Sequence, residues 1–260
     1  MIMENTMENM TRKKSKIASW FALCPAAHII ALLSAAVIAL HLALRGDHAL
    51  MERISENAVR PVHAALAVLN SHVGFSVAEV LIVITAAAVL ARLVYGLVRL
   101  LRGKSSLRRA YRLVMGLAAL ALAVYAGFSL LWGVYYYGDD FMAKSELDSS
   151  PVSTEQLETV TEYFARLANR YGDEVERNAD GFYVCDRDAI LARSPSLFDN
   201  TVGDFPCMYG PRVAAKGVWL SRGMSYIDFT GFFFPFTGEA NVNTDFPPSL
   251  FASTVAHELS

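Results

Sequence analysis

Three apolar runs in the first 140 residues constrain the fold of this chain more than any other feature of its sequence. They cover residues 17–44, 77–98 and 113–137, and a polar break follows each of them. A helix needs about 20 apolar residues to cross the hydrocarbon core of a bilayer, so each run is long enough for one crossing. The sequence therefore predicts a membrane domain over residues 17–137 with three transmembrane helices.

The distribution of basic residues predicts how these helices are oriented. A basic stretch precedes the first run and holds Arg12, Lys13, Lys14 and Lys16. The connection over residues 99–112 carries six basic residues and no acidic one, whereas residues 45–76 carry three of each. Short loops rich in Lys and Arg stay in the cytoplasm. We therefore expect residues 1–16 to form a cytoplasmic basic N-terminus and residues 138–260 to lie outside.

The connection over residues 45–76 has a helical pattern of its own. Apolar residues recur in it at helical spacing: Ile54, Ala58, Val62, Leu66 and Leu69. This spacing predicts an amphipathic helix on the membrane surface or under the outer domain. Pro61 lacks a backbone N–H and is expected to break or restart that helix.

Residues 138–260 have the charge of an acidic extracytoplasmic domain. They contain 19 Asp and Glu against 9 Lys and Arg, while the first 137 residues contain 6 acidic and 14 basic residues. An acidic domain repels phosphate, so nucleic acid is not an expected partner. Cys185 and Cys207 either pair as a disulfide in an oxidising compartment or remain two small buried thiols.

The outer domain alternates helical and extended patterns, which predicts an α+β fold. Ser153 and Gln156 have the spacing of a capping box that opens a helix over residues 154–172. Further helices are expected over residues 186–194 and from Pro247 or Pro248 to the end. The expected strands cover residues 182–185, 217–221 and 226–236.

Polar and apolar side chains alternate in the segment PFTGEANVNTDF, residues 235–246. In an extended strand, Glu239, Asn241 and Asn243 share one face. That face is either the polar outer side of a strand or part of an edge strand beside a cleft, where the three residues contact an extended ligand. Phe246 stands where a calcium loop requires glycine, which argues against a calcium site.

The final residues STVAHELS place His257 and Glu258 on the last predicted helix. Residues i and i+4 share a helix face, so His257 could bind zinc together with a histidine directly after Ser260. Glu258 would then be the general base that takes a proton from zinc-bound water. A strand, a polar turn and a His-Glu helix follow one another in zinc peptidases. The alternative is an ordinary helix end with a chance His-Glu pair.

The segments GFFFPFTGEANVN and FASTVAHELS resemble the signature region of a bacterial integral-membrane family of unknown function. Members of that family carry an extracytoplasmic zincin-like domain after three spans, and their signature continues into His-Glu-x-x-His. The segments GFSVAEV and LWGVYYY lie where the family has similar segments. The resemblance implies a protein of the bacterial cytoplasmic membrane in which His257 is the first zinc ligand and Glu258 is the catalytic glutamate.

The chain departs from that family pattern at the metal site. After His72 the sequence contains no histidine except His257, so it offers neither a second histidine nor a third ligand. The final helix also lacks a capping signal, which leads us to expect a fragment of a longer protein.

Two functions from different classes follow from these observations. The first is a membrane-anchored zinc metallopeptidase, or its N-terminal portion, which cleaves peptides or proteins outside the cytoplasm. The second is a non-enzymatic membrane protein whose acidic outer domain binds a protein or an envelope partner. A metal site completed beyond Ser260 would distinguish the first from the second.

Overall fold

The computed structural model describes residues 19–103, 106–148 and 150–260. The predicted basic stretch at residues 12–16 lies outside the described residues. The chain divides into two compact units. We call Met1–Val59 with Val80–Gly138 the membrane unit, and Arg60–Glu79 with Asp139–Ser260 the sheet unit.

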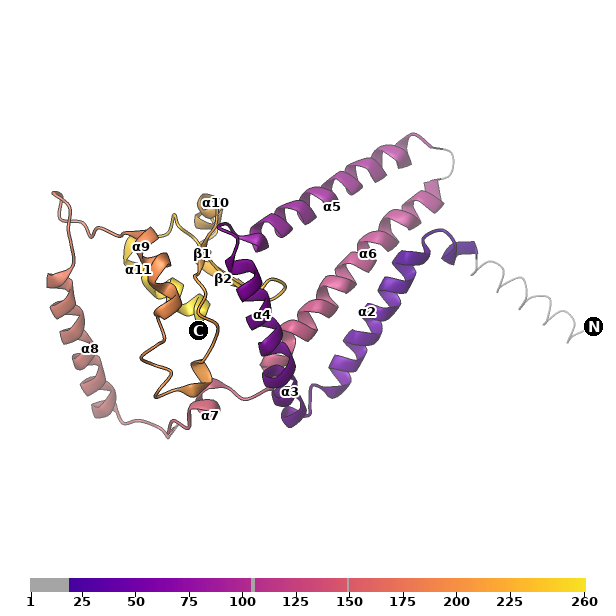
Figure 1. Cartoon of the computed structure of the whole chain (residues 1–260). Helices are drawn as coiled ribbons and strands as arrows, with labels where there is room; N and C mark the ends of the chain where they lie inside the picture. Colours follow the sequence, from indigo (N-terminus) through magenta and orange to yellow (C-terminus); the bar gives the residue numbers. More distant parts are fainter. Residues whose placement is uncertain (1–18, 104–105, 149) are drawn as a thin grey trace, which may run out of the picture. The chain divides into compact units, whose positions relative to one another are not determined.

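Three helices are long and apolar enough to cross a bilayer, which confirms the prediction of a membrane protein with transmembrane helices (Figure 1). They are α2 (Pro25–Leu44), α5 (Val77–Leu101) and α6 (Ser106–Leu131). Helix α6 begins before the predicted run at residue 113 because Arg108 to Arg112 continue the same helix on the polar side of the apolar segment. A short 3-10 helix, η2 (Gly133–Tyr137), follows α6.

Polar side chains inside the predicted spans bond to neighbouring groups of the membrane unit. The Nε2 atom of His28 lies 2.7 Å from the hydroxyl of Tyr111 on α6. Arg92 donates to the carbonyl of Arg112 at 3.2 Å. Helices α2 and α6 pack side by side. These contacts are typical of structural polar residues in a helical bundle.

The connection between the first two spans is helical, as its apolar spacing indicates. It contains α3 (His48–Ile54), the π-helix η1 (Ser55–Val59) and α4 (Arg60–Ser71). The change from π-helix to α-helix falls one residue before Pro61. Because proline has no N–H to donate, the regular bonding ladder is interrupted there.

A small mixed sheet forms the centre of the sheet unit. Its strands are β1 (Lys216–Gly217), β2 (Gly231–Phe234) and β3 (Glu239–Val242). Their order is β1-β3-β2, with β1 parallel and β2 antiparallel to β3. Strand β3 is therefore the central strand. This placement differs from the edge strand that the sequence predicted for Glu239, Asn241 and Asn243.

The remaining helices of the sheet unit are mostly short. They are α7 (Phe141–Ser145), α8 (Thr154–Glu174), α9 (Arg187–Arg193), α10 (Ser221–Ser225) and α11 (Pro248–Leu259), with 3-10 helices η3 (Ser194–Ser196) and η4 (Pro206–Met208). The predicted capping box of α8 is confirmed, since both the Ser153 and the Gln156 bonds are present. The predicted strand at residues 182–185 is wrong. Only an isolated bridge joins Tyr183 to Arg177 there, because the chain turns back at once.

Helix α11 packs on the apolar side of β3 and forms the main core of the sheet unit. Phe251 and Val255 of α11 are buried against Ala240 and Val242 of β3. The three cysteines are free thiols, including Cys185 and Cys207. The described residues thus form a mostly helical protein with three long apolar helices and one small mixed sheet.

Candidate functional site

Glu258 lies near the C-terminal end of α11, against the edge strand β2. A Cβ atom added at Gly231 of β2 would lie only 2.8 Å from Oε1 of Glu258. The absence of a side chain at Gly231 therefore lets the carboxylate approach the strand closely. Burial raises the pKa of Glu258, whereas the neighbouring His257 and a hydrogen bond from the backbone N–H of Phe233 lower it. Glu258 is a half-buried, oriented carboxyl group.

His257 has a different environment from its neighbour. Its side chain is exposed on α11, beside the half-buried Glu258. An exposed imidazole next to an oriented carboxylate can bind a metal ion or take part in proton transfer. The structure thus places the two predicted residues side by side, at the end of the sheet where β2 is the edge strand.

The polar residues in and directly after β3 bond to other parts of the protein itself. Glu239, Asn241 and Asn243 are all buried. The Nδ2 atom of Asn243 donates to the Oγ of Ser225 at 3.0 Å and to the carbonyl of Phe229 at 2.9 Å. The alternation read from the sequence is present, but both faces of β3 are covered. Glu239 and Asn241 therefore hold neighbouring segments in place.

Glu239 accepts hydrogen bonds from the first turn of α5. The backbone N–H groups of Val77 and Ala78 donate to its carboxylate at 3.2 and 2.7 Å. The first N–H groups of a helix have no partner within the helix, and the helix dipole favours a negative charge at that end. The carboxylate of Glu239 therefore supplies both the hydrogen-bond acceptors and the charge that this helix end needs.

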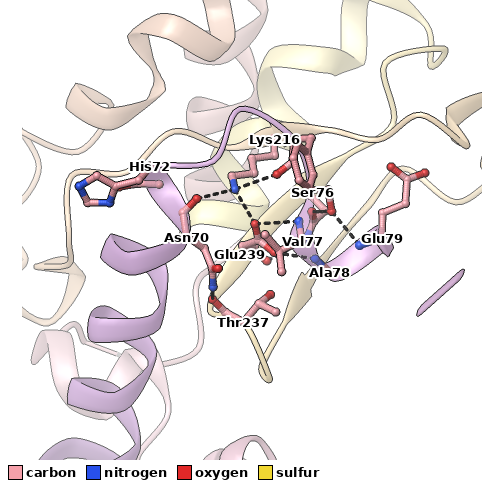
Figure 2. A network of polar contacts seen from close by, with 12 residues as sticks. Asn70, His72, Ser76, Val77, Ala78, Glu79, Lys216, Thr237 and Glu239 are labelled. Atoms are coloured by element: carbon pink, nitrogen blue, oxygen red, sulfur yellow. Dashed lines mark hydrogen bonds and ion pairs between the residues drawn. The ribbon is translucent and has the colours of Figure 1, made fainter. Parts of the chain in front are cut away.

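Lys216 of β1 balances the buried charge of Glu239. Its Nζ atom lies 2.6 Å from Oε1 of Glu239, and their side chains are only 11% and 3% exposed. The same ammonium donates to the carbonyls of Asn70 at 2.7 Å and Phe75 at 2.9 Å. Figure 2 shows Lys216 with dashed lines to Asn70 and Glu239. All three ammonium hydrogens thus have acceptors, which a buried lysine requires.

The first turn of α5 also carries a carboxylate of its own, which bonds to another segment of the sheet unit. Glu79, in the first turn of α5, accepts the backbone N–H groups of Trp219 at 2.9 Å and Leu220 at 2.7 Å. Ser76 accepts the N–H of Glu79 and donates to Oδ1 of Asn241 at 2.6 Å. The two carboxylates fasten the start of α5 to β3 and to the segment after β1.

Sequence reasoning missed Lys216, Ser76 and Glu79. One signal was present for two of them, since Ser76 and Glu79 have the Ser-x-x-Glu spacing that precedes an apolar helix. The serine does cap the helix, but Glu79 bonds to a segment 140 residues further along the chain. No local pattern predicts that long-range partner, and none indicates Lys216.

The described residues contain no group of three His, Cys, Asp or Glu side chains arranged to hold a metal ion. A catalytic zinc site needs three protein ligands. Within the part of the chain that the structure describes, His257 and Glu258 are neighbours near the end of α11.

The model of a family described as a protein of unknown function (DUF3810) matches residues 55–260. This range is more than three quarters of the 260 residues. The chain belongs to the DUF3810 family. The DUF3810 region includes α5, α6 and the whole sheet unit, and it ends beyond Glu258. Neither a comparison with curated proteins nor one with solved structures gave a match.

Proposed function

We propose that this DUF3810 protein contributes the His-Glu part of a zinc peptidase site in a membrane-anchored hydrolase. His257 is one zinc ligand, and Glu258 is the general base. The proposal places the sheet unit outside the cytoplasm, where its substrates are peptides or proteins. The fold around the site is zincin-like in this proposal.

The position of Glu258 is the observation that carries the proposal. Its carboxylate lies within reach of β2, the edge strand of the sheet, and the N–H of Phe233 orients it. A general base must be oriented toward the proton that it removes, and burial that raises its pKa makes it a better proton acceptor near neutral pH. A peptide lying along an edge strand would pass beside this carboxylate.

A bound zinc ion would supply a water molecule with a lowered pKa. Glu258 would accept a proton from that water and later deliver it to the leaving amine, while His257 would hold the ion from the same helix. A catalytic zinc ion would need two protein ligands in addition to His257. The proposal fits the signature resemblance, in which a second histidine follows one helical turn after the first.

The test uses the full native polypeptide in detergent or in a bilayer. We expect about one zinc ion per chain, as in single-zinc peptidases, and loss of that zinc in His257→Ala. Glu258→Gln should keep the zinc and lose about 100-fold to 10,000-fold of the peptidase rate, because general-base catalysis contributes roughly that factor. Glu158→Gln, an exposed change on α8, is the matched control and should keep both properties.

Two results would contradict the proposal. The first is a native polypeptide that takes up no zinc under conditions that load other zinc peptidases. The second is a Glu258→Gln variant that hydrolyses peptides as fast as the unmodified protein. Either result would leave His257 and Glu258 as the ordinary end of a helix.

A second candidate function is binding of a protein or envelope partner without catalysis. One observation favours it: across Thr154–Glu174, all described, helix α8 has no buried residue. Its apolar side chains, Leu157, Val160 and Phe164 among them, are exposed. A helix with an uncovered apolar stripe is typical of a segment that docks on a partner. Retained partner binding by Glu258→Gln would support this function.

A further inference from the structure

Exposed apolar side chains lie in two segments of the sheet unit, one directly before α5 and one between β1 and β2. We call Phe75, Trp219, Leu220, Tyr226 and Ile227 together the aromatic patch. Trp219 is 70% exposed, Tyr226 80% and Ile227 73%. Phe75 and Trp219 stack with their ring centroids 5.5 Å apart. Large apolar side chains that stay exposed in a fixed arrangement indicate an interaction surface.

The backbone beneath the aromatic patch is held firmly. The Oγ of Ser221 accepts the N–H of Thr244 at 2.9 Å, and Asn243 bonds to Ser225 and to the carbonyl of Phe229. Both Ser221 and Asn243 are buried. The segment between β1 and β2 thus turns its polar groups toward β3 and its apolar side chains outward. The exposure of the patch is therefore a consequence of the fold.

The depth of the patch in a bilayer follows from its attachment to α5. The N–H groups of Trp219 and Leu220 bond directly to Glu79, in the first turn of that helix. Helix α5 has 25 residues, and at 1.5 Å per residue it is about 37 Å long. The hydrocarbon core is about 30 Å thick, so the ends of such a helix reach the headgroup regions. Trp219 lies at one of these ends.

We propose that the aromatic patch inserts into the interfacial layer of the membrane and forms a bilayer contact additional to the three spanning helices. Tryptophan and tyrosine are enriched at this depth because their rings combine apolar faces with a polar atom. Arg222 is exposed within the same segment and can reach lipid phosphates. Asp228 is the single acidic residue between Trp219 and Phe229. The occupant of the patch is thus lipid.

The experiment measures the fluorescence of Trp219 in vesicles. The chain contains three tryptophans. Trp20→Phe combined with Trp132→Phe leaves Trp219 as the single emitter in the full chain. The protein is reconstituted in phosphatidylcholine vesicles that carry bromine either near the headgroup end or near the middle of the acyl chain. We expect Trp219 to lose most emission with the shallow bromine and less with the deep one.

A matched control places a tryptophan at an equally exposed position of the sheet unit. Phe182 is 69% exposed, so Phe182→Trp in a chain with all three native tryptophans replaced by Phe reports that position. We expect little quenching there. If the double variant does not fold, the emission of Trp219 and its quenching are obtained as the difference between the unmodified protein and Trp219→Phe.

Two outcomes would overturn the proposal. In one, Trp219 is quenched no more than the tryptophan introduced at position 182. In the other, Trp219 emits at short wavelength without quenching by either lipid, which would mean that protein, from a second copy or a partner, covers the patch. Because the readout does not depend on zinc or on hydrolysis, it is independent of the proposed peptidase function.

Discussion

The ion pair of Lys216 and Glu239 connects strands β1 and β3 to the residues around the start of α5. The lysine bonds to the main chain of residues 70 and 75, and the glutamate bonds to the start of α5. The sequence correctly predicted an alternating polar strand. It did not predict burial, because a period of two assigns side chains to faces and leaves open what covers each face.

Replacing Lys216 by methionine tests this pair. Lys216→Met keeps the length of the side chain but leaves the carboxylate of Glu239 buried without its counter-charge. We expect a loss of about 3 to 5 kcal/mol of unfolding free energy, the usual cost of removing one partner of a buried pair. Denaturant unfolding, followed by the fluorescence of the sheet unit, measures it.

The control for this change is Arg166→Met on α8. The ion pair of Arg166 and Glu162 is exposed, and exposed pairs contribute roughly 0.2 to 1 kcal/mol. Equal losses in the two variants would contradict the structural role assigned to Lys216.

His63 of α4 predicts a pH dependence of stability. Its ring is buried and lies with its centroid 5.1 Å from that of Phe233. Burial lowers the pKa of His63 below its ordinary value, and a hydrogen bond to the carbonyl of Pro235 opposes this in part. The unfolded chain therefore binds a proton more readily than the folded one. Stability is complete above the unfolded pKa and falls as pH decreases through the folded pKa.

The measurement is the unfolding midpoint of the protein as pH is lowered from about 7.5 to 5, across the ordinary pKa of histidine near 6.5. We expect the midpoint of the unmodified protein to fall over this range and that of His63→Gln to fall less. His72→Gln, a change at an exposed histidine, should behave like the unmodified protein. A fall of the same size in His63→Gln would exclude His63 as its cause.

At the scale of elements, the turn between β2 and β3 depends on one glycine. Gly238 has a φ of 66°, and a Cβ atom there would lie 2.5 Å from the carbonyl oxygen of His63 on α4. Left-handed backbone disfavours any residue with a Cβ atom. A side chain at position 238 is therefore disfavoured twice, by the left-handed backbone and by the steric clash with α4.

Gly238→Ala should destabilise the sheet unit by at least about 2 kcal/mol, since backbone strain and a main-chain clash act together. Gly181→Ala is the matched control: Gly181 has a φ of 80° but open space around it. We expect a loss of only about 1 kcal/mol there. Thermal unfolding of the two variants gives the comparison, and a smaller loss for Gly238→Ala than for Gly181→Ala would contradict the argument.

Helices whose ends are determined by neighbouring residues were predictable from the sequence. The length of a strand, which depends on its pairing partner, was not. Helix α8 carries its own capping box, and α11 begins at Pro248 as expected. The aromatic content of residues 226–236 predicted a strand of that length, yet only Gly231–Phe234 pairs. The reason lies in the partner, because β3 offers only Glu239–Val242 for pairing.

At the scale of the whole molecule, the membrane helices were the most predictable part. Length and hydropathy are sums over neighbouring residues, so three apolar runs are enough to indicate three spans. The division of the chain into units was harder. Residues 60–79, which run from the connection between the first two spans into the first turn of α5, belong with residues 139–260. This grouping arises from contacts between segments that are distant in the sequence. Such contacts cannot be predicted from a single sequence.

The same is true of the candidate site. The sequence predicted His257 and Glu258 on one helix, and the structure has them there. The close approach of Glu258 to Gly231 could not be predicted, since it depends on how α11 packs against a strand more than 20 residues earlier.

The cap on α5 has a consequence for how the protein is made. Glu239 follows Val77 by 162 residues. A ribosome that has just released the second span has not yet synthesised the carboxylate that the span's first turn requires. Until then, water or the insertion machinery must satisfy those amide groups. A residue translated much later than α5 thus completes the hydrogen bonding of its first turn.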